Sequence, residues 1–207
     1  MEKRCEIKSH GIHVLLSNHK SIRKLKKDYA PSNHGHKVWP SSWLLIDYLK
    51  HMDFKKGRRI LDIGCGWGLS GIFCAKHFKA TVTCIDGDEE VYPYVEFLAG
   101  INKVNINFLS MEFSKIKRNI LKHSNVIIGS DICFCDTLID PLRRLIQRAK
   151  KAGVEKIVIS DPGRWPFDDL SDLYINQRGT EVTDWQIARP IKTAGRILDI
   201  SFYGRSK

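Results

Sequence analysis

Residues 60–71 have the sequence ILDIGCGWGLSG, in which a short apolar run meets a series of closely spaced glycines. The run over residues 59–63 predicts a strand, and a helix through about His77 is expected after the glycines. Glycine at such a junction lets the backbone approach a ligand where any Cβ would clash. This stretch therefore predicts a ligand-binding turn between a strand and a helix.

The rest of the chain alternates short β-branched runs with stretches of helical period, which is the pattern of stacked strand–helix–strand units. Further strands are expected over residues 80–86, 105–109, 125–129, 156–160, 181–187 and 196–203. Helices are expected over residues 43–52, from Asp140 as an N-cap, and after Pro166. The pattern favours an α/β fold with a doubly wound, Rossmann-like sheet.

The basic charge is concentrated near the start of the chain. Residues 1–59 carry 14 Lys or Arg against 5 Asp or Glu, a net of +9, whereas residues 60–207 carry 20 against 18. We expect residues 1–38 to form a basic arm or lid and residues 39–207 to form a single ligand-binding domain. A basic extension can engage nucleic acid or an acidic partner, or can simply aid solubility. No nucleic-acid motif accompanies the charge, so a nucleic-acid partner would depend on charge alone.

Two ligands fit the glycine turn. Gly66, Gly68 and Gly71 satisfy the dinucleotide pattern, and Asp86 follows about twenty residues later, where a ribose-binding acid is expected. Asp62 favours another ligand, because a carboxylate at this place would face the negative pyrophosphate of a dinucleotide. The same carboxylate suits S-adenosylmethionine, which carries an ammonium group and a sulfonium. A nicotinamide dinucleotide is the alternative.

Residues 61–68, LDIGCGWG, resemble motif I of the class I S-adenosylmethionine-dependent methyltransferases. The resemblance extends over about residues 38–174 and implies a seven-stranded, mostly parallel sheet with an antiparallel last strand. It also implies that the glycines line the methionine end of the cofactor, that Asp86 holds its ribose, and that Glu112 or Phe113 lies beside its adenine. With a tryptophan that closes over the site, the predicted cofactor-binding residues are Trp39, Asp62, Gly64, Cys65, Gly66, Gly68, Asp86, Gly87, Glu112, Phe113 and Ser130.

Three short segments resemble the branch of this family that contains seven-strand protein lysine methyltransferases and nicotinamide N-methyltransferase-like enzymes. Residues 38–45 resemble its tryptophan–proline entry to the first helix. Residues 130–136 occupy the place of its acid-x-x-aromatic motif, with phenylalanine where tyrosine is usual. Residues 160–164, SDPGR, resemble a segment of the electron-transfer-flavoprotein β-subunit lysine methyltransferases. The resemblance implies N-methylation of lysine in a protein substrate.

Lysine methylation requires a free amine, and a reference pKa near 10.4 makes that form cost roughly 4–5 kcal/mol at pH 7. A fixed carboxylate can orient the amine and take its proton, and we predict Asp131 for this role, with Phe134 as an apolar wall. Asp161 and Arg164 are predicted to hold the substrate or to pair with one another. A mechanism that needs a tyrosine hydroxyl is not expected here, because Phe134 has none.

Two other functions stay open at this point. A small-molecule N-methyltransferase, acting on a heterocycle or an amine, predicts a cavity closed by residues 1–38. A non-catalytic cofactor-binding module that holds RNA or an acidic partner is consistent with the basic arm and the missing tyrosine.

Composition and motifs make several other classes of protein poor candidates. No run approaches the ~18 apolar residues of a membrane span, and the N-terminal residues lack the apolar region of a signal peptide. Six cysteines are too sparse for a disulfide scaffold in a chain of 207 residues, which favours a cytoplasmic protein. The pair Cys133 and Cys135 has no second pair at ligand spacing, so no metal site is expected.

Overall fold

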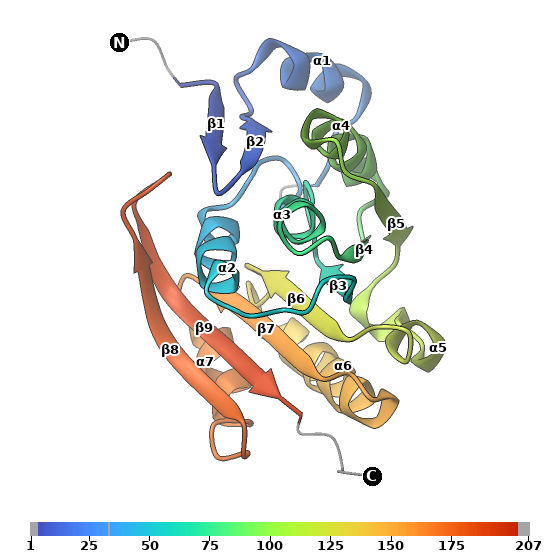
Figure 1. Cartoon of the computed structure of the whole chain (residues 1–207), viewed down its shortest axis with the longest axis vertical. Coiled ribbons are helices and arrows are strands. Elements are labelled where there is room, and N and C mark those ends of the chain that lie inside the picture. The colour runs from blue at the N-terminus through green and yellow to red at the C-terminus, as the bar shows by residue number, and fades with distance from the viewer. Residues whose placement is uncertain (1–3, 33, 203–207) are drawn as a thin grey trace.

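A seven-stranded sheet with the order β5-β4-β3-β6-β7-β9-β8 runs through the computed structural model, which describes residues 4–32 and 34–202 (Figure 1). Its strands are β3 (Arg59–Ile63), β4 (Thr81–Asp86), β5 (Ile106–Ser110), β6 (Val126–Ser130), β7 (Lys156–Asp161), β8 (Thr180–Ile187) and β9 (Thr193–Ser201). Strands β3 to β7 pair in parallel, and β9 is antiparallel to both β7 and β8. The predicted Rossmann-like sheet with an antiparallel last strand is confirmed.

The strand order reverses beside β3, because β4 pairs with one of its edges and β6 with the other. In open α/β sheets the connections at such a point leave a crevice at the carboxyl ends of the strands, where ligands bind. The glycine turn follows β3, and residues 131–134 follow β6. The predicted cofactor-binding turn and the predicted catalytic segment after β6 therefore both lie at this crevice.

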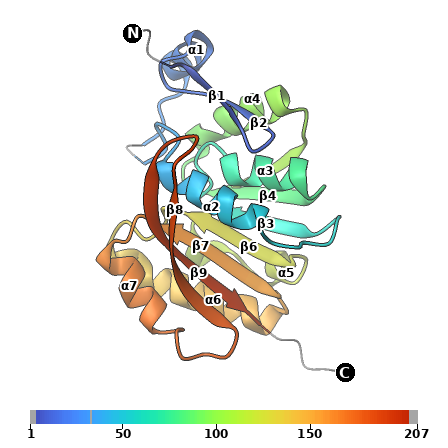
Figure 2. The same ribbon diagram turned by 60° about the vertical axis from the view of Figure 1, so that its left-hand side comes forward.

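Helices cover both faces of the sheet (Figure 2). The α-helices after residue 39 are α2 (Pro40–Lys50), α3 (Leu69–His77), α4 (Tyr92–Asn102), α5 (Arg118–Leu121), α6 (Ile139–Ala152) and α7 (Trp165–Asp172). The 3-10 helices are η1 (Glu89–Val91), η2 (Phe113–Lys115) and η3 (Asp136–Leu138). One hydrophobic core joins the sheet to α2, α3 and α4, and a second core joins it to α5, α6 and α7. The doubly wound arrangement thus buries both faces of the central strands.

The start of the chain is more ordered than the sequence indicated. Strands β1 (Glu6–Ser9) and β2 (Ile12–Leu15) form an antiparallel hairpin, and helix α1 (Lys20–Asp28) follows it. The two-residue turn has positive φ at both His10 (51°) and Gly11 (75°), as a tight hairpin of this length requires. Strands of four residues are too short to show a periodic pattern, which explains why the hairpin was not predicted.

The hairpin is attached to the domain by burial and by one asparagine. Ile7, Ile12 and Val14 are at most 2% exposed and belong to the core on the α3 and α4 side. The Asn102 side chain at the end of α4 accepts from the His13 N–H at 2.8 Å and donates to the His13 carbonyl at 2.7 Å. The division of the chain at residues 38 and 39 stays a prediction.

Element ends differ from the predictions at a few places. Asp140 was predicted as an N-cap, which is wrong: α6 begins at Ile139 because η3 leads directly into it. Asp140 lies in the first turn instead, where it pairs with Arg143 at 2.5 Å and with Arg144 at 2.7 Å. The last strand ends at Ser201, and Tyr203, its predicted end, lies outside the described residues.

Among the helices that the structure describes, none has the length and apolar character needed to cross a membrane.

Candidate active site

The glycine turn after β3 has the geometry that its composition predicted. Gly64, Gly66 and Gly68 have φ values of 58°, 51° and 71°, a region that side chains with a Cβ rarely adopt. A Cβ on Gly64 would lie 2.6 Å from Cγ2 of Ile132, whereas a Cβ on Gly66 would meet no atom within 4 Å. The turn thus has a crowded side toward β6 and an open side at Gly66, where a ligand can approach the backbone.

Asp86 connects the turn to the end of the next strand. Its Oδ2 accepts from the Gly66 N–H at 2.8 Å, and its Oδ1 accepts from the Asp88 N–H at 3.0 Å. Burial raises the pKa of Asp86, although these backbone hydrogen bonds oppose the shift. The carboxylate therefore fixes two loops and still has lone pairs for the hydroxyl groups of a ribose.

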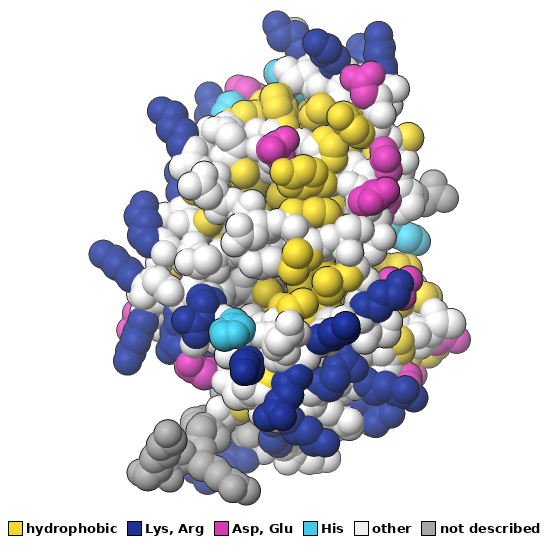
Figure 3. Space-filling view, turned by 90° about the vertical axis from the view of Figure 1, so that its right-hand side faces the viewer, with side chains coloured by type: hydrophobic (Ala, Val, Ile, Leu, Met, Phe, Trp, Pro, Cys, Tyr) yellow, Lys and Arg dark blue, Asp and Glu magenta, His cyan; other side chains and the backbone are white. Residues whose placement is uncertain are grey.

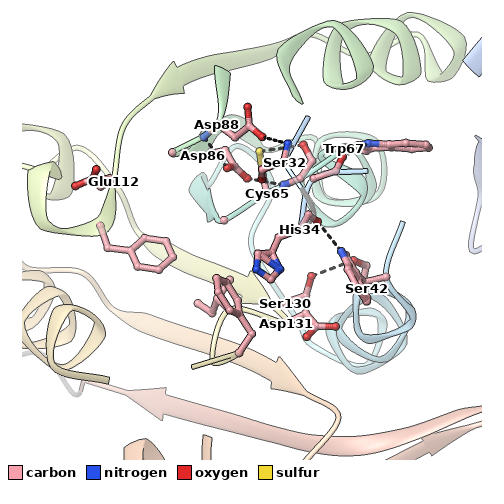
Figure 4. Close-up of a pocket in the computed structure, with 18 of the residues that line it drawn as sticks. Ser32, His34, Ser42, Cys65, Trp67, Asp86, Asp88, Glu112, Ser130 and Asp131 are labelled. Atoms are coloured by element: carbon pink, nitrogen blue, oxygen red, sulfur yellow. Dashed lines mark hydrogen bonds between the residues drawn. The ribbon is translucent and has the colours of Figure 1, made fainter. Parts of the chain in front are cut away.

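A cavity of about 1290 Å³ extends from this turn to the ends of β6 and β7. Asp86 and Asp88 lie on one side of it and Ser130 and Asp131 on the other, with the His34 ring between them (Figure 4). Most of the predicted site residues line this cavity, namely Trp39, Gly64, Cys65, Gly66, Asp86, Gly87, Glu112, Phe113, Ser130, Asp131, Phe134 and Arg164.

Asp62 was predicted to face the ligand, and the structure corrects that placement. Its side chain is 2% exposed and does not line the cavity, and its Oδ2 accepts from the Gly71 N–H of α3 at 2.8 Å. Burial raises the pKa of Asp62 to about 8, with a further increase from the nearby Asp86 charge. The carboxyl group therefore fixes the first turn of α3 to β3 from a buried position.

Gly68 and Asp161 also lie outside the cavity lining. A Cβ on Gly68 would lie 3.1 Å from Cγ1 of Val95, so this glycine permits close packing between the turn and α4. Asp161 is fully buried, and its Oδ1 accepts from the Gly163 and Arg164 N–H groups, both at 2.9 Å. Burial raises its pKa to about 6. Asp161 therefore shapes the loop that carries Arg164, and its Oδ2 lies 3.8 Å from the Arg164 guanidinium, as in the predicted pairing of these two residues.

Asp131 and Arg164 form an ion pair at the part of the cavity that adjoins the ends of β6 and β7. Asp131 has a φ of 63°, and its backbone N–H donates to the Ser160 carbonyl at 2.9 Å. Its other carboxylate oxygen accepts from the Ser41 hydroxyl at 3.1 Å. Three segments thus meet at one carboxylate that is held in a fixed orientation at the cavity wall.

The segment before α2 forms one wall of the cavity, through contacts that the sequence did not show. The Ser32 N–H donates to Oδ2 of Asp88 at 2.6 Å, and the Ala30 N–H donates to Oε2 of Glu90 at 3.1 Å. The Trp67 indole donates to the Gly35 carbonyl at 2.8 Å. This segment is therefore attached to the acidic end of β4 and to the glycine turn.

His34 and Ser42 are site residues that sequence reasoning missed. The His34 ring stacks on Phe134 with centroids 4.1 Å apart and an angle of 26°. The Ser42 and Ser130 hydroxyl groups lie 3.0 Å apart and share a hydrogen bond. The predicted Trp39 donates to the His34 carbonyl at 2.7 Å. The only signal for His34 was that six of the eight histidines fall in residues 1–59.

The charge of the lining favours a cationic ligand. Six carboxylates line the cavity, whereas Lys37 and Arg164 are the cations among the lining residues. The carboxylates are Asp86, Asp88, Glu89, Glu90, Glu112 and Asp131. A pyrophosphate would face this negative lining, whereas a sulfonium and an ammonium would be attracted to it. The six lining carboxylates, rather than Asp62, therefore favour S-adenosylmethionine over a nicotinamide dinucleotide.

Within residues 4–32 and 34–202, no group of three or more His, Cys, Asp or Glu could hold a metal ion.

Comparison with known families and proteins agrees with this arrangement. A family model described as lysine methyltransferase matches residues 18–164. The chain is 26% identical over 132 residues to an electron transfer flavoprotein β subunit lysine methyltransferase of Danio rerio, covering 63% of this chain and 50% of that protein. It is 34% identical over 119 residues to a histidine protein methyltransferase 1 homolog of Dictyostelium discoideum, covering 53% and 38%. The chain thus spans half or less of the length of these relatives.

Solved structures share the fold. The human methyltransferase 10 domain containing protein superposes with a TM-score of 0.61 at 15% identity, over 87% of this chain and 94% of that one. The plantazolicin methyltransferase BpumL, in complex with SAH, superposes with a TM-score of 0.57 at 16% identity, over 90% and 92%. At such identities the likeness concerns the fold alone.

Proposed function

The chain belongs to the lysine methyltransferase family, and from that premise we propose that it transfers a methyl group from S-adenosylmethionine to a lysine of a protein substrate. One observation carries the proposal: a single cavity joins the glycine turn of β3 to the Asp131–Arg164 pair. The glycine turn offers backbone groups that can contact the methyl donor, and the Asp131–Arg164 pair offers a fixed carboxylate that can bind the acceptor amine.

The residues of the cavity fit the donor. Gly66 leaves open space above its Cα, Asp86 can accept from ribose hydroxyl groups, and the six lining carboxylates suit a cation. In this assignment Gly64, Cys65 and Gly66 lie along the methionine part, and Glu112 and Phe113 lie along the adenine. When bound, S-adenosylmethionine supplies an electrophilic methyl carbon on a sulfonium.

The protein's own task is to present an unprotonated amine. In the proposed reaction the lysine ammonium donates to Asp131, which takes its proton directly or passes it to water. Arg164 and Ser41 keep the carboxylate in place, so it does not need to reorganise as the charge changes. The Phe134 ring, stacked on His34, forms an apolar wall along the aliphatic part of the lysine.

The test is transfer of labelled methyl groups. We expect the purified chain, incubated with methyl-labelled S-adenosylmethionine and a protein extract, to label discrete proteins, with methyl-lysine in their hydrolysates. Asp131→Asn serves as the control that binds cofactor without transfer. Label in neither proteins nor small molecules, with cofactor binding intact, would favour a non-catalytic module.

A small-molecule N-methyltransferase is the second candidate, and the wall made by residues 30–32 and 34–39 favours it. Ser32, His34 and Lys37 line the cavity, where they would contact a compact acceptor. The same extract, separated by size, distinguishes the two candidates. Label confined to compounds below about 1 kDa would support the small-molecule activity and contradict the protein one.

A further inference from the structure

A basic strip lies along α5 and α6, outside the cavity. We define it as Lys117, Arg118, Lys122, Arg144, Arg148 and Lys151. Residues 114–130 contain four Lys or Arg and residues 141–154 contain five, and neither segment contains Asp or Glu. Residues 60–207 as a whole have a net charge of only +2, because the acidic residues of that region lie outside these two segments.

The fold brings the two segments together. Helix α6 packs against both α5 and η2, and the Arg148 guanidinium donates to the Phe113 carbonyl at 2.9 Å. Arg144, Arg148 and Lys151 are four and three residues apart, so they follow one face of α6. Figure 3 shows Lys and Arg side chains gathered over the part of this face that α5 and α6 form.

Little within the protein balances this charge. Lys117, Arg118, Lys122 and Lys151 are exposed, and their side chains have no ion pair or hydrogen bond with any residue that the structure describes. Arg144 pairs with Asp140 at 2.7 Å, in a contact that is exposed on both sides. Four exposed cations beside one another form a surface that attracts a polyanion.

The strip begins at the rim of the cavity. Ser114 and Pro141 line the cavity, and Lys117 and Arg144 each follow three residues later. From Pro141 to Lys151 the helix rises about 15 Å, at 1.5 Å per residue. A chain that leaves the cavity along α6 would therefore reach the strip within roughly three to six extended residues.

We propose that the basic strip docks an acidic segment of the methyl-acceptor protein, about three to six residues from the target lysine; this inference depends on the proposed function. Opposite charge supplies the attraction and sets the direction in which the acceptor crosses the cavity. Acidic residues near the target then raise the local concentration of the lysine at Asp131.

An acidic protein fits the strip better than a nucleic acid does. The large hydrophobic side chains exposed among the described residues include none from residues 114–130 or 141–154. The one exposed ring in these two segments is the small imidazole of His123, so the strip lacks the series of aromatic rings on which successive bases stack. The strip also adjoins the cavity of a chain in a lysine methyltransferase family. Both observations point to a protein as the partner.

Binding is tested with fluorescein-labelled poly-L-glutamate, measured by anisotropy on the full chain. We expect the charge-reversed variant Lys117→Glu/Lys122→Glu/Lys151→Glu to bind about tenfold more weakly than the wild type, and high salt to remove the difference. The control is Lys20→Glu/Lys24→Glu/Lys27→Glu, which makes the same change of charge at three exposed lysines of α1. Equal weakening by both variants would overturn the proposal.

Methyl transfer is tested with lysine peptides that carry three glutamates or three glutamines at positions +3 to +6. We expect a KM about tenfold lower for the acidic peptide, and we expect the strip variant alone to lose this preference. Equal KM values in the wild type would overturn the strip proposal and leave the proposed function standing. Strip-dependent binding of polyuridylate without a peptide preference would also overturn it. No methylation of either peptide, with strip-dependent binding of poly-L-glutamate intact, would overturn the proposed function instead.

Discussion

The two ends of the cavity are built in different ways. At the donor end, residues 64–67 and 86–88 define the surface, and Asp86 joins them by two hydrogen bonds. At the acceptor end, side chains from three separate segments meet at Asp131, and His34 comes from a fourth. The comparison teaches that the donor end depends on main-chain conformation, whereas the acceptor end depends on individual side-chain contacts.

The largest effect is expected at the acceptor end. Asp131→Asn removes the carboxylate charge but tolerates the φ of 63°, because asparagine adopts the left-handed region readily. We expect kcat to fall roughly 10²–10³-fold, in the range of a lost proton acceptor, with the Kd of S-adenosylmethionine unchanged. Steady-state kinetics and calorimetry measure the two quantities. If kcat and the affinity for S-adenosylmethionine fell by the same factor, the donor and acceptor ends of the cavity would not act independently.

The donor end is tested by Gly66→Ala. The φ of 51° makes alanine cost roughly 1 kcal/mol of stability, and the added Cβ occupies the open space above the turn. We expect cofactor binding to weaken by about tenfold or more. Gly57→Ala is the matched control, because Gly57 has a φ of 78°, no atom within 4 Å and no place in the cavity lining. It is expected to lose similar stability and no affinity. Equal affinity in the two variants would refute the assignment of the turn.

The stacked rings of Phe134 and His34 test whether the acceptor end depends on individual side-chain contacts. Phe134→Ala and His34→Ala should each lower kcat/KM by about tenfold, since each removes one half of a stacked pair at the acceptor end. The double variant should be little worse than either single one, with a coupling of about 1 kcal/mol. Strict additivity in the double-mutant cycle would mean that the two rings act independently.

The last effect concerns Asp62 and is a change in stability with pH rather than in activity. Its pKa is about 8 in the folded protein, whereas the ordinary value for an aspartate is 3.8, so the folded state holds a proton that the unfolded state releases between these two pH values. The contribution of Asp62 to stability is therefore present below about pH 4 and decreases as pH rises to about 8. Asp62→Asn can still accept from the Gly71 N–H but does not titrate. Its Tm should decline less than that of the wild type between pH 5 and pH 8, and parallel Tm curves would contradict this account.

The same contrast explains what could be predicted from the sequence. The strands, the glycine turn and Asp86 follow from local patterns, because period, glycine spacing and strand ends are properties of contiguous residues. Asp131 and Arg164 were both predicted as site residues, because both follow strand ends. Their contact with one another was not predicted, because it depends on the loop that Asp161 shapes. The side on which Asp62 lies could not be predicted, because a one-residue change in strand register reverses the direction of a side chain.

In the wall formed by residues 30–32 and 34–39, only Trp39 had a local signal, in the tryptophan–proline sequence at the start of α2. The position of this wall depends on hydrogen bonds from Ala30 and Ser32 to acids some 60 residues later, and on the Trp67 indole. The hairpin before it had a weak signal in His10-Gly11, which is a less common pair at such a turn than Asn-Gly. Long-range contacts of this kind are fixed by the whole fold rather than by neighbouring residues.

The central claim is that the acidic cavity holds a cationic methyl donor. Isothermal titration of the purified chain with S-adenosylmethionine and, separately, with NAD tests it most directly. The account predicts saturable binding of S-adenosylmethionine that weakens in Gly66→Ala but not in Gly57→Ala, and no binding of NAD. Binding of NAD, with no heat from S-adenosylmethionine, would contradict it.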